Sequence, residues 1–258
     1  MTDRQPQAAA PRRRWWNLLF IVLMLGLTVI FLWLGNWQLQ RLDEKQALIA
    51  TVAARMDSAP LRLPPVAEWD FVGWERYDYQ PVTLTGSFRH DSTVLVFTSL
   101  SAPNGRHSGP GYWVMAPFEL DAGGFVFLNR GFVPQSSRAA FVDGGAAPTG
   151  RLTLTGIARL SEEAGSFTPD TDSTRRMDWV RDVERLALQS DADLTPLAPV
   201  FVDLPAGDEG ALPQGGETVL TFTDNHLGYA ITWFGFALIT PLLLLVWLLA
   251  QRRARKVP

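Results

Sequence analysis

One histidine stands where a polar run meets a long apolar run near the end of the chain. His226 closes the polar residues 223–226, and residues 227–250 contain no charged side chain. These 24 positions exceed the roughly 20 helical residues that cross the hydrocarbon core of a bilayer. We therefore predict that His226 lies at a membrane–water boundary, and we take its imidazole as the leading candidate for a functional group.

Two aromatic residues share the predicted helical face with His226. Tyr229 and Trp233 follow it at i+3 and i+7, a spacing that places side chains on one side of a helix. Their rings could stack on or flank a planar ligand. The alternative for both is an interfacial aromatic, the usual role of Tyr and Trp at a membrane boundary. The alternative for His226 is a helix cap or a hydrogen-bonded residue.

A second apolar run covers residues 18–34, after three arginines and two tryptophans at residues 12–16. No small-x-small cleavage site follows it, so we predict an uncleaved membrane anchor rather than a secretory signal peptide. The stretch ahead of this run is too short for a transit peptide, which favours a bacterial protein over a mitochondrial one.

The outer end of this first span carries two further candidate residues. Trp37 would lie at the same outer boundary as His226, and Arg41 would lie one turn further out. Trp37 has the alternative role of an interfacial aromatic. The alternatives for Arg41 are contact with lipid headgroups or pairing with Asp224 or Glu44.

The charge distribution predicts an orientation. The chain has a net charge of −3, residues 1–14 carry +3 and the residues after Gln251 carry +4, so the part between them sums to −10. Basic flanks stay on the cytoplasmic side of a membrane, so both termini are predicted inside and the acidic middle outside. An acidic middle disfavours nucleic acid as a partner. The absence of cysteine from the sequence excludes a disulfide scaffold and a thiolate metal site.

Between the two spans the sequence predicts a compact, mainly antiparallel β domain, a small barrel or sandwich with few helices. The expected strands are residues 79–88, 93–98, 112–120, 125–133, 151–160 and 200–204, with a loop over 99–111. Helices are expected over residues 37–55, which contain no Gly or Pro, and over 178–189. Gly228 and Gly235, seven residues apart, predict close packing of the two spans.

The predicted organisation therefore has five parts. They are a cytoplasmic tail (1–14), a transmembrane helix (15–37), a periplasmic β-rich domain (38–226), a second transmembrane helix (227–250) and a second cytoplasmic tail (251–258).

Three sequence blocks carry a resemblance to a known family. They are residues 34–41 (LGNWQLQR), residues 117–118 with 128–134 (PF and LNRGFVP), and residues 225–234 (NHLGYAITWF). Together they closely resemble the Surfeit locus protein 1 family, assembly factors for haem–copper cytochrome oxidases. Phe132 stands where the family usually has Trp, and Gly228 stands where a larger polar residue is common.

The resemblance implies a function that the residue patterns alone do not supply. Such proteins promote maturation of the catalytic subunit of the oxidase, and bacterial members are linked to haem a. The family's proposed iron ligand matches His226, so the resemblance implies haem a as cofactor and His226 as the metal ligand. The surrounding cofactor-binding residues would be Tyr229, Trp233, Trp37 and Arg41. Arg41 could pair with a haem propionate.

The implied partners are the catalytic subunit, other assembly or haem a synthesis proteins, and membrane lipid, and the implied location is the bacterial inner membrane. Two alternatives stay open. One is an interaction protein that stabilises an oxidase assembly intermediate without binding haem. The other is an enzyme, but the sequence has no GxSxG, HExxH or P-loop motif. The adjacent Glu162 and Glu163 resemble a solvated turn more than an acid/base pair, so we predict no enzymatic activity.

Overall fold

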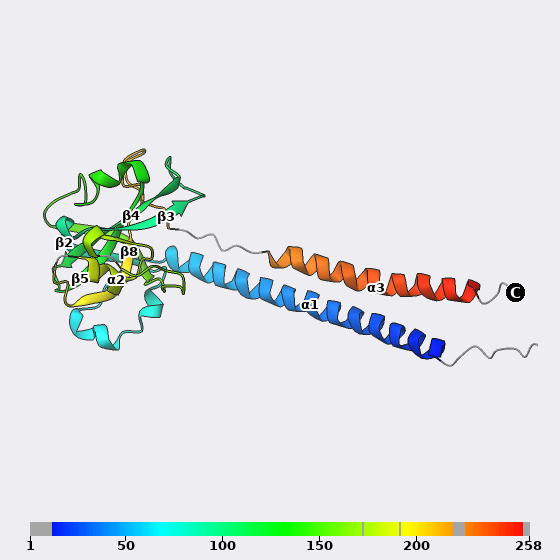
Figure 1. Ribbon diagram of the computed structural model, residues 1–258. Coiled ribbons are helices and arrows are strands. Elements are labelled where there is room, and N and C mark those ends of the chain that lie inside the picture. Colours follow the sequence, from blue (N-terminus) through cyan, green and yellow to red (C-terminus); the bar gives the residue numbers. More distant parts are fainter. Residues whose placement is uncertain (1–11, 172, 191, 219–224, 255–258) are drawn as a thin grey trace, which may run out of the picture. The chain divides into compact units, whose positions relative to one another are not determined.

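The computed structural model describes residues 12–171, 173–190, 192–218 and 225–254, and the chain divides into two units. Residues 1–50 with 221–258 form the helical unit, and residues 51–220 form the β unit. Figure 1 shows two long helices, α1 and α3, and a separate group of strands. The prediction of two apolar helices that flank a β domain with few helices is confirmed.

Helix α1 (Arg12–Met56) continues well beyond its apolar part. Residues 37–55 are rich in good helix formers and contain no Gly or Pro, and Pro60 follows the end of the helix. The predicted extension of the first span is therefore confirmed. Within the described residues, two helices are long and apolar enough to cross a membrane, Trp15–Met56 and His226–Arg253. The predicted membrane boundaries themselves stay predictions.

Helix α3 (His226–Ala254) begins at the candidate histidine. Its first intrahelical bond runs from the Tyr229 N–H to the Asn225 carbonyl, at 3.2 Å, so Asn225 occupies the position before the helix. Asp224, the residue before it, lies outside the described residues. Pro241 lies inside the helix, as membrane helices tolerate.

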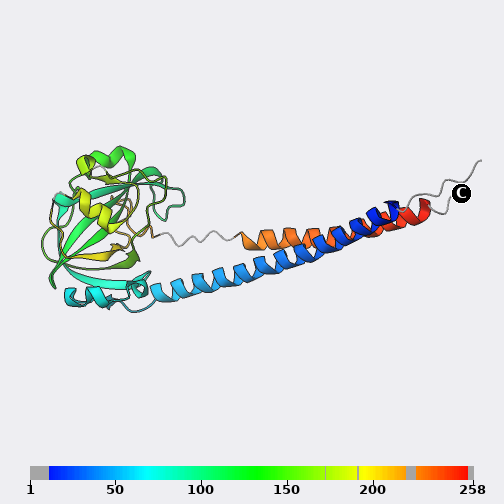
Figure 2. The same ribbon diagram turned by 60° about the horizontal axis from the view of Figure 1, so that its bottom comes forward.

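Within the helical unit, α1 and α3 pack side by side (Figures 1 and 2). The buried positions on α3 include Ala230, Ala237 and Leu244, seven residues apart. On α1, a Cβ added to Gly35 would lie 2.8 Å from the Phe234 ring, so the absence of a side chain allows this close approach. Rings pack along the same contact, with Phe31 stacked on Trp233 and Phe20 tilted against Trp247.

The prediction that Gly228 and Gly235 provide the close packing is wrong. A Cβ added to either glycine would meet no atom within 4 Å. On α3 the buried small residues are Ala230 and Ala237. The glycine that a side chain packs against is Gly35, on α1.

The β unit contains a closed ring of five strands. β2 (Pro81–Phe88) pairs with β6 (Leu152–Leu160), β6 with β8 (Leu197–Asp203), β8 with β5 (Phe125–Pro134), β5 with β4 (Gly109–Leu120), and β4 again with β2. Only the β5–β8 pairing is parallel among these five, so the barrel is mixed but mainly antiparallel. β3 (Val94–Leu100) and β7 (Met177–Asp178) extend the sheet beyond β4, and β1 (Leu61–Arg62) pairs with β2.

Closure of the barrel depends on a close backbone approach at Gly86. Gly86 pairs with Leu120 on β4 and with Leu152 on β6. A Cβ at this position would lie 2.0 Å from the Glu119 carbonyl oxygen. A glycine in a strand often marks such a bend or close approach.

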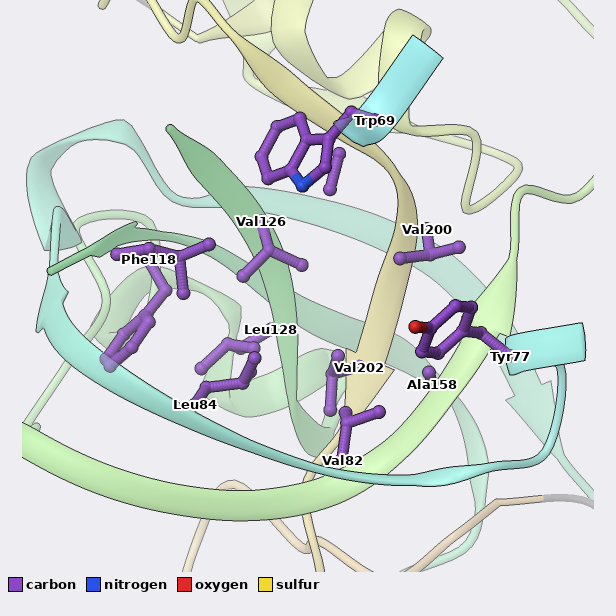
Figure 3. Close-up of a cluster of buried hydrophobic side chains, with 12 residues drawn as sticks. Trp69, Tyr77, Val82, Leu84, Phe118, Val126, Leu128, Ala158, Val200 and Val202 are labelled. Carbon is purple, nitrogen blue, oxygen red and sulfur yellow. The ribbon is translucent and has the colours of Figure 1, made fainter. Parts of the chain in front are cut away.

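Apolar side chains from all five barrel strands fill the interior (Figure 3). Trp69 and Tyr77 lie at the margin of this cluster and come from two 3-10 turns, Val66–Phe71 and Trp74–Tyr77. The Trp69 indole N–H donates to the Pro64 carbonyl at 2.8 Å, which satisfies its polar atom on burial. These turns are not among the elements expected from the sequence.

The expected strands are all present, with ends that differ by a few residues, and β4 and β5 form an antiparallel hairpin. The expected loop over 99–111 is partly strand, because β3 reaches Leu100 and β4 begins at Gly109. The helix expected over 178–189 is α2 (Val183–Gln189) only. The Asp182 side chain accepts from the N–H groups of Glu184 and Arg185 and so starts the helix there.

We predict that Gly35→Ala weakens the packing of α1 on α3. The added methyl must displace the Phe234 ring, and overpacking of this kind costs about 1–3 kcal/mol. Gly26→Ala is the matched control, because a Cβ at Gly26 meets nothing within 4 Å and Ala stabilises a helix by about 0.5–1 kcal/mol relative to Gly. Thermal unfolding of the full chain in detergent micelles should show a lower Tm for Gly35→Ala and an unchanged or higher Tm for Gly26→Ala. Equal shifts would contradict the assigned contact.

Candidate functional site

The imidazole of His226 forms a hydrogen bond with a side chain of the other helix. His226 Nδ1 lies 2.7 Å from Gln38 Oε1. His226 is half-buried, and Gln38 is 8% exposed. An amide oxygen can only accept a hydrogen bond, so in this arrangement Nδ1 carries the proton and the lone pair of a neutral ring lies on Nε2.

The packing of the two helices explains this pairing. Gln38 lies three residues after Gly35 and therefore on the same side of α1. His226, Ala230, Trp233 and Ala237 follow one another at helical spacing along α3. The close approach at Gly35 thus brings the first residue of α3 within reach of the Gln38 amide.

The predicted aromatic neighbours of His226 have different surroundings. The Trp233 ring stacks on Phe31, with centroids 5.7 Å apart, and meets Phe236 edge to face at 6.0 Å. Trp233 is therefore part of the packing between the helices. Tyr229 is 57% exposed and remains accessible beside the start of α3.

On α1, the predicted residues Trp37 and Arg41 contact each other. The Arg41 guanidinium carbon lies 5.7 Å from the centre of the Trp37 ring, and Arg41 Nη1 lies 2.8 Å from Glu44 Oε2. The alternative pairing of Arg41 with Glu44 is thus confirmed, whereas Asp224 lies outside the described residues. Both members of the ion pair are more than half exposed, and such a pair contributes only about 0–1 kcal/mol, so Arg41 can change partner at little cost.

Residue patterns alone do not assign a role to Gln38. The residue stands inside one of the family blocks, directly after Trp37. The sequence does carry one signal for it, since Gln38 is a polar amide three residues after Gly35, at the end of an apolar run. This signal does not show which face of the helix packs against the second span.

The side chains near His226 fit a haem iron, which is already held by a macrocycle, better than a bare metal ion. Among the residues that the structure describes, no three His, Asp or Glu side chains gather in a way that could hold a bare metal ion. Haem iron needs only an axial ligand from the protein, and imidazole is a common one. In metal-binding histidines the other ring N–H usually donates to a carboxylate, a backbone carbonyl or water, and the Gln38 amide oxygen is an acceptor of the same kind as a backbone carbonyl.

The second family block serves the architecture of the barrel. Asn129 Nδ2 donates to Asp203 Oδ1 at 2.8 Å, and its Oδ1 accepts from the Gly131 N–H. Arg130 donates to the carbonyls of Gly144 and Ala146, and burial lowers the pKa of its guanidinium. Gly131 has a positive φ of 128° and approaches the backbone of residue 214 too closely for a side chain. This geometry supports a structural role for the block.

The expectation of a solvated turn fits the exposed Glu163, but Glu162 forms an ion pair with Arg181. Glu162 Oε1 accepts from Arg181 Nε at 2.9 Å, and Oε2 accepts from the Arg181 backbone N–H at 3.0 Å. Burial alone would raise the pKa of Glu162, but the charge and hydrogen bonds of Arg181 outweigh it and hold the pKa below its usual value. Glu163 is exposed, so the two neighbouring carboxylates have different environments.

A sequence model of the SURF1 family matches residues 25–238, which include both Gln38 and His226. The chain belongs to the SURF1 family. The SURF1-like protein of Monosiga brevicollis is 31% identical over 238 residues, which cover 89% of this chain and 87% of the relative. The SURF1-like protein of Drosophila melanogaster is 32% identical over 228 residues, which cover 81% of this chain and 71% of the relative.

Surfeit locus protein 1 of Homo sapiens is 29% identical over 240 residues, or 86% of this chain and 75% of the human protein. The resemblance stated from the three sequence blocks is therefore confirmed. The SURF1 family is known for cytochrome c oxidase assembly factors and is not a catalytic family.

We predict that Glu162→Gln destabilises the protein in a pH-dependent way. The folded pKa of Glu162 lies below its unfolded value of about 4.3. Its contribution is therefore complete above the unfolded pKa and is lost as the pH falls through the folded pKa. Because the carboxylate is 39% exposed, we expect a loss of about 1 kcal/mol at neutral pH. Thermal unfolding should show a Tm difference from wild type that shrinks below about pH 4.

Glu163→Gln provides the matched control, since it makes the same change at the adjacent exposed carboxylate. Its Tm should follow wild type across the same pH range. A Tm loss for Glu162→Gln that does not vary with pH would argue against the ion pair as its cause.

Proposed function

We propose that this protein is a non-enzymatic, membrane-anchored assembly factor for a haem–copper cytochrome c oxidase, and that it binds haem a and aids insertion of the haem into the catalytic subunit. Membership of the SURF1 family supports the assembly role. The observation that carries the haem-binding part is the hydrogen bond of His226 Nδ1 with Gln38 Oε1 at 2.7 Å, because this bond favours the neutral form of the ring in which Nε2 is the nitrogen able to bind iron.

The residues around His226 have surfaces suited to a large planar cofactor. Tyr229 and Trp37 are 57% and 39% exposed, and exposed aromatic rings can flank a planar macrocycle. Arg41 can exchange its exposed partner Glu44 for a propionate at little cost. Trp233 would not contact the cofactor. It would hold the start of α3 in place through its stack on Phe31. When bound, haem a supplies the redox-active iron that the oxidase requires.

The two candidate spans support a location of this site at a membrane boundary. With both basic ends cytoplasmic, the β unit and His226 lie on the outer, periplasmic side of a bacterial inner membrane. An imidazole at that boundary leaves the isoprenoid tail of haem a in the bilayer and the propionates in water. The partner that receives the haem is the catalytic subunit of the oxidase.

The test is the haem content of the purified full chain after co-expression with a haem a synthesis pathway. Wild type should carry haem a, visible in the absorption spectrum, and His226→Ala should lose most of it because the axial ligand is gone. His107→Ala is the matched control, since it removes a histidine from a loop of the β unit and should leave the haem content unchanged.

Equal haem a in wild type and His226→Ala would show that His226 is not the ligand. If His226→Ala also supports normal oxidase assembly while changes on the surface of the β unit abolish it, the protein acts as an interaction protein without a haem site.

A further inference from the structure

Gln38 is a buried polar residue on a helix face that is otherwise packed. It is 8% exposed and lies one turn beyond Gly35, where Phe234 fills the space beside the backbone. Burial of an amide without a hydrogen-bond partner destabilises a protein. Its oxygen accepts from His226 at 2.7 Å, so the burial of Gln38 and the orientation of His226 depend on each other.

This hydrogen bond selects one form of the imidazole ring. A neutral imidazole carries one proton, on either Nδ1 or Nε2, and the protonated nitrogen cannot bind a metal. The Gln38 oxygen stabilises the form with the proton on Nδ1. In that form Nε2 is the nitrogen able to bind iron.

We infer that Gln38 is a positioning residue, which holds His226 in the Nδ1–H tautomer and thereby presents Nε2 as the haem ligand. This inference rests on the proposed function and deepens it. An acceptor on the far nitrogen also raises the basicity of the ligating nitrogen, and loss of such a partner typically lowers metal affinity 10–100-fold.

If Gln38 only joined the two helices, the tautomer of His226 would respond differently to its substitution. The Gln38 amide can accept through Oε1 or donate through its NH2 group, so a clamp would work with either tautomer. A Glu at this position can accept but, when ionised, cannot donate, and a Leu can do neither. The tautomer of His226 in these variants therefore separates positioning from packing.

The first measurement uses the full chain in detergent micelles without haem. Imidazole 15N NMR at alkaline pH, where the ring is neutral, reports which nitrogen of His226 carries the proton. We expect the Nδ1–H form in wild type and in Gln38→Glu, and loss of its dominance in Gln38→Leu. Gln40→Leu makes the same change at an exposed position two residues away and should match wild type.

The second measurement is titration of the same variants with ferric haem a. We expect the affinity of Gln38→Leu to fall about tenfold or more, and that of Gln38→Glu and Gln40→Leu to stay within a few-fold of wild type. The carboxylate of Gln38→Glu should also lower the reduction potential of the bound iron, because a stronger acceptor increases the electron donation of the imidazole. A Tm for each variant identifies any loss of folding, and Gln38→Glu tests the inference even if Gln38→Leu does not fold.

His226→Ala separates the two ways in which the inference can fail. If His226→Ala loses haem but Gln38→Leu keeps both the wild-type tautomer and the wild-type affinity, the role of Gln38 is overturned and the proposed function stands. If His226→Ala binds haem a as wild type does, the ligand assignment fails and the inference fails with it.

Discussion

Polar groups on helices that cross a bilayer have no water to bind within the hydrocarbon core, so they must find partners in the protein. Thr28, Thr232 and Thr240 meet this requirement locally, since each hydroxyl donates to the carbonyl four residues earlier in its own helix. Gln38, which lies at the predicted outer boundary of the first span, instead bonds to His226 on the other helix. The threonine hydroxyls add no hydrogen bond between the two helices, whereas the Gln38–His226 hydrogen bond joins them.

The contact of Phe234 with Gly35 determines which side of α1 packs against α3. Phe234 packs against this glycine, and Gln38 follows on the same side. Trp37 is one residue earlier, about 100° around the helix, and retains an exposed surface. Neighbouring residues of one family block thus have different surroundings, because Gln38 contacts the imidazole while Trp37 and Arg41 are exposed.

Much of the fold could be predicted from the sequence because its signals are local. Long uncharged runs predict the two helices, and the turn between β4 and β5 predicts the hairpin. The missed features depend on contacts between distant residues. Closure of β2 on β4 requires the approach of Gly86 to Glu119, and the ion pair of Glu162 joins it to Arg181. No local pattern contains such information.

The same limit applies to the candidate site. The boundary position of His226 could be predicted from the change of composition at residue 227. The identity of its hydrogen-bond partner could not, because a helical repeat places residues on faces without showing which face is covered. Gly228 and Gly235 had the right spacing for a packed face, yet both lie in open space. Small residues permit close packing, but the side chains that fill the space decide where it occurs.

The β unit contains buried charged residues, and their substitution could remove function by unfolding the unit. Asp178 is fully buried and bonds to Arg185 and Gln189, and Arg130 bonds to backbone carbonyls. Removal of one partner from a buried pair costs about 3–5 kcal/mol, a large fraction of the stability of a domain. Loss of the proposed assembly function in variants at these residues would therefore reflect misfolding of the β unit. A surface role for the β unit requires variants that keep its Tm, whereas Gln38 and His226 belong to the other unit and can be altered without removing any of these buried charges.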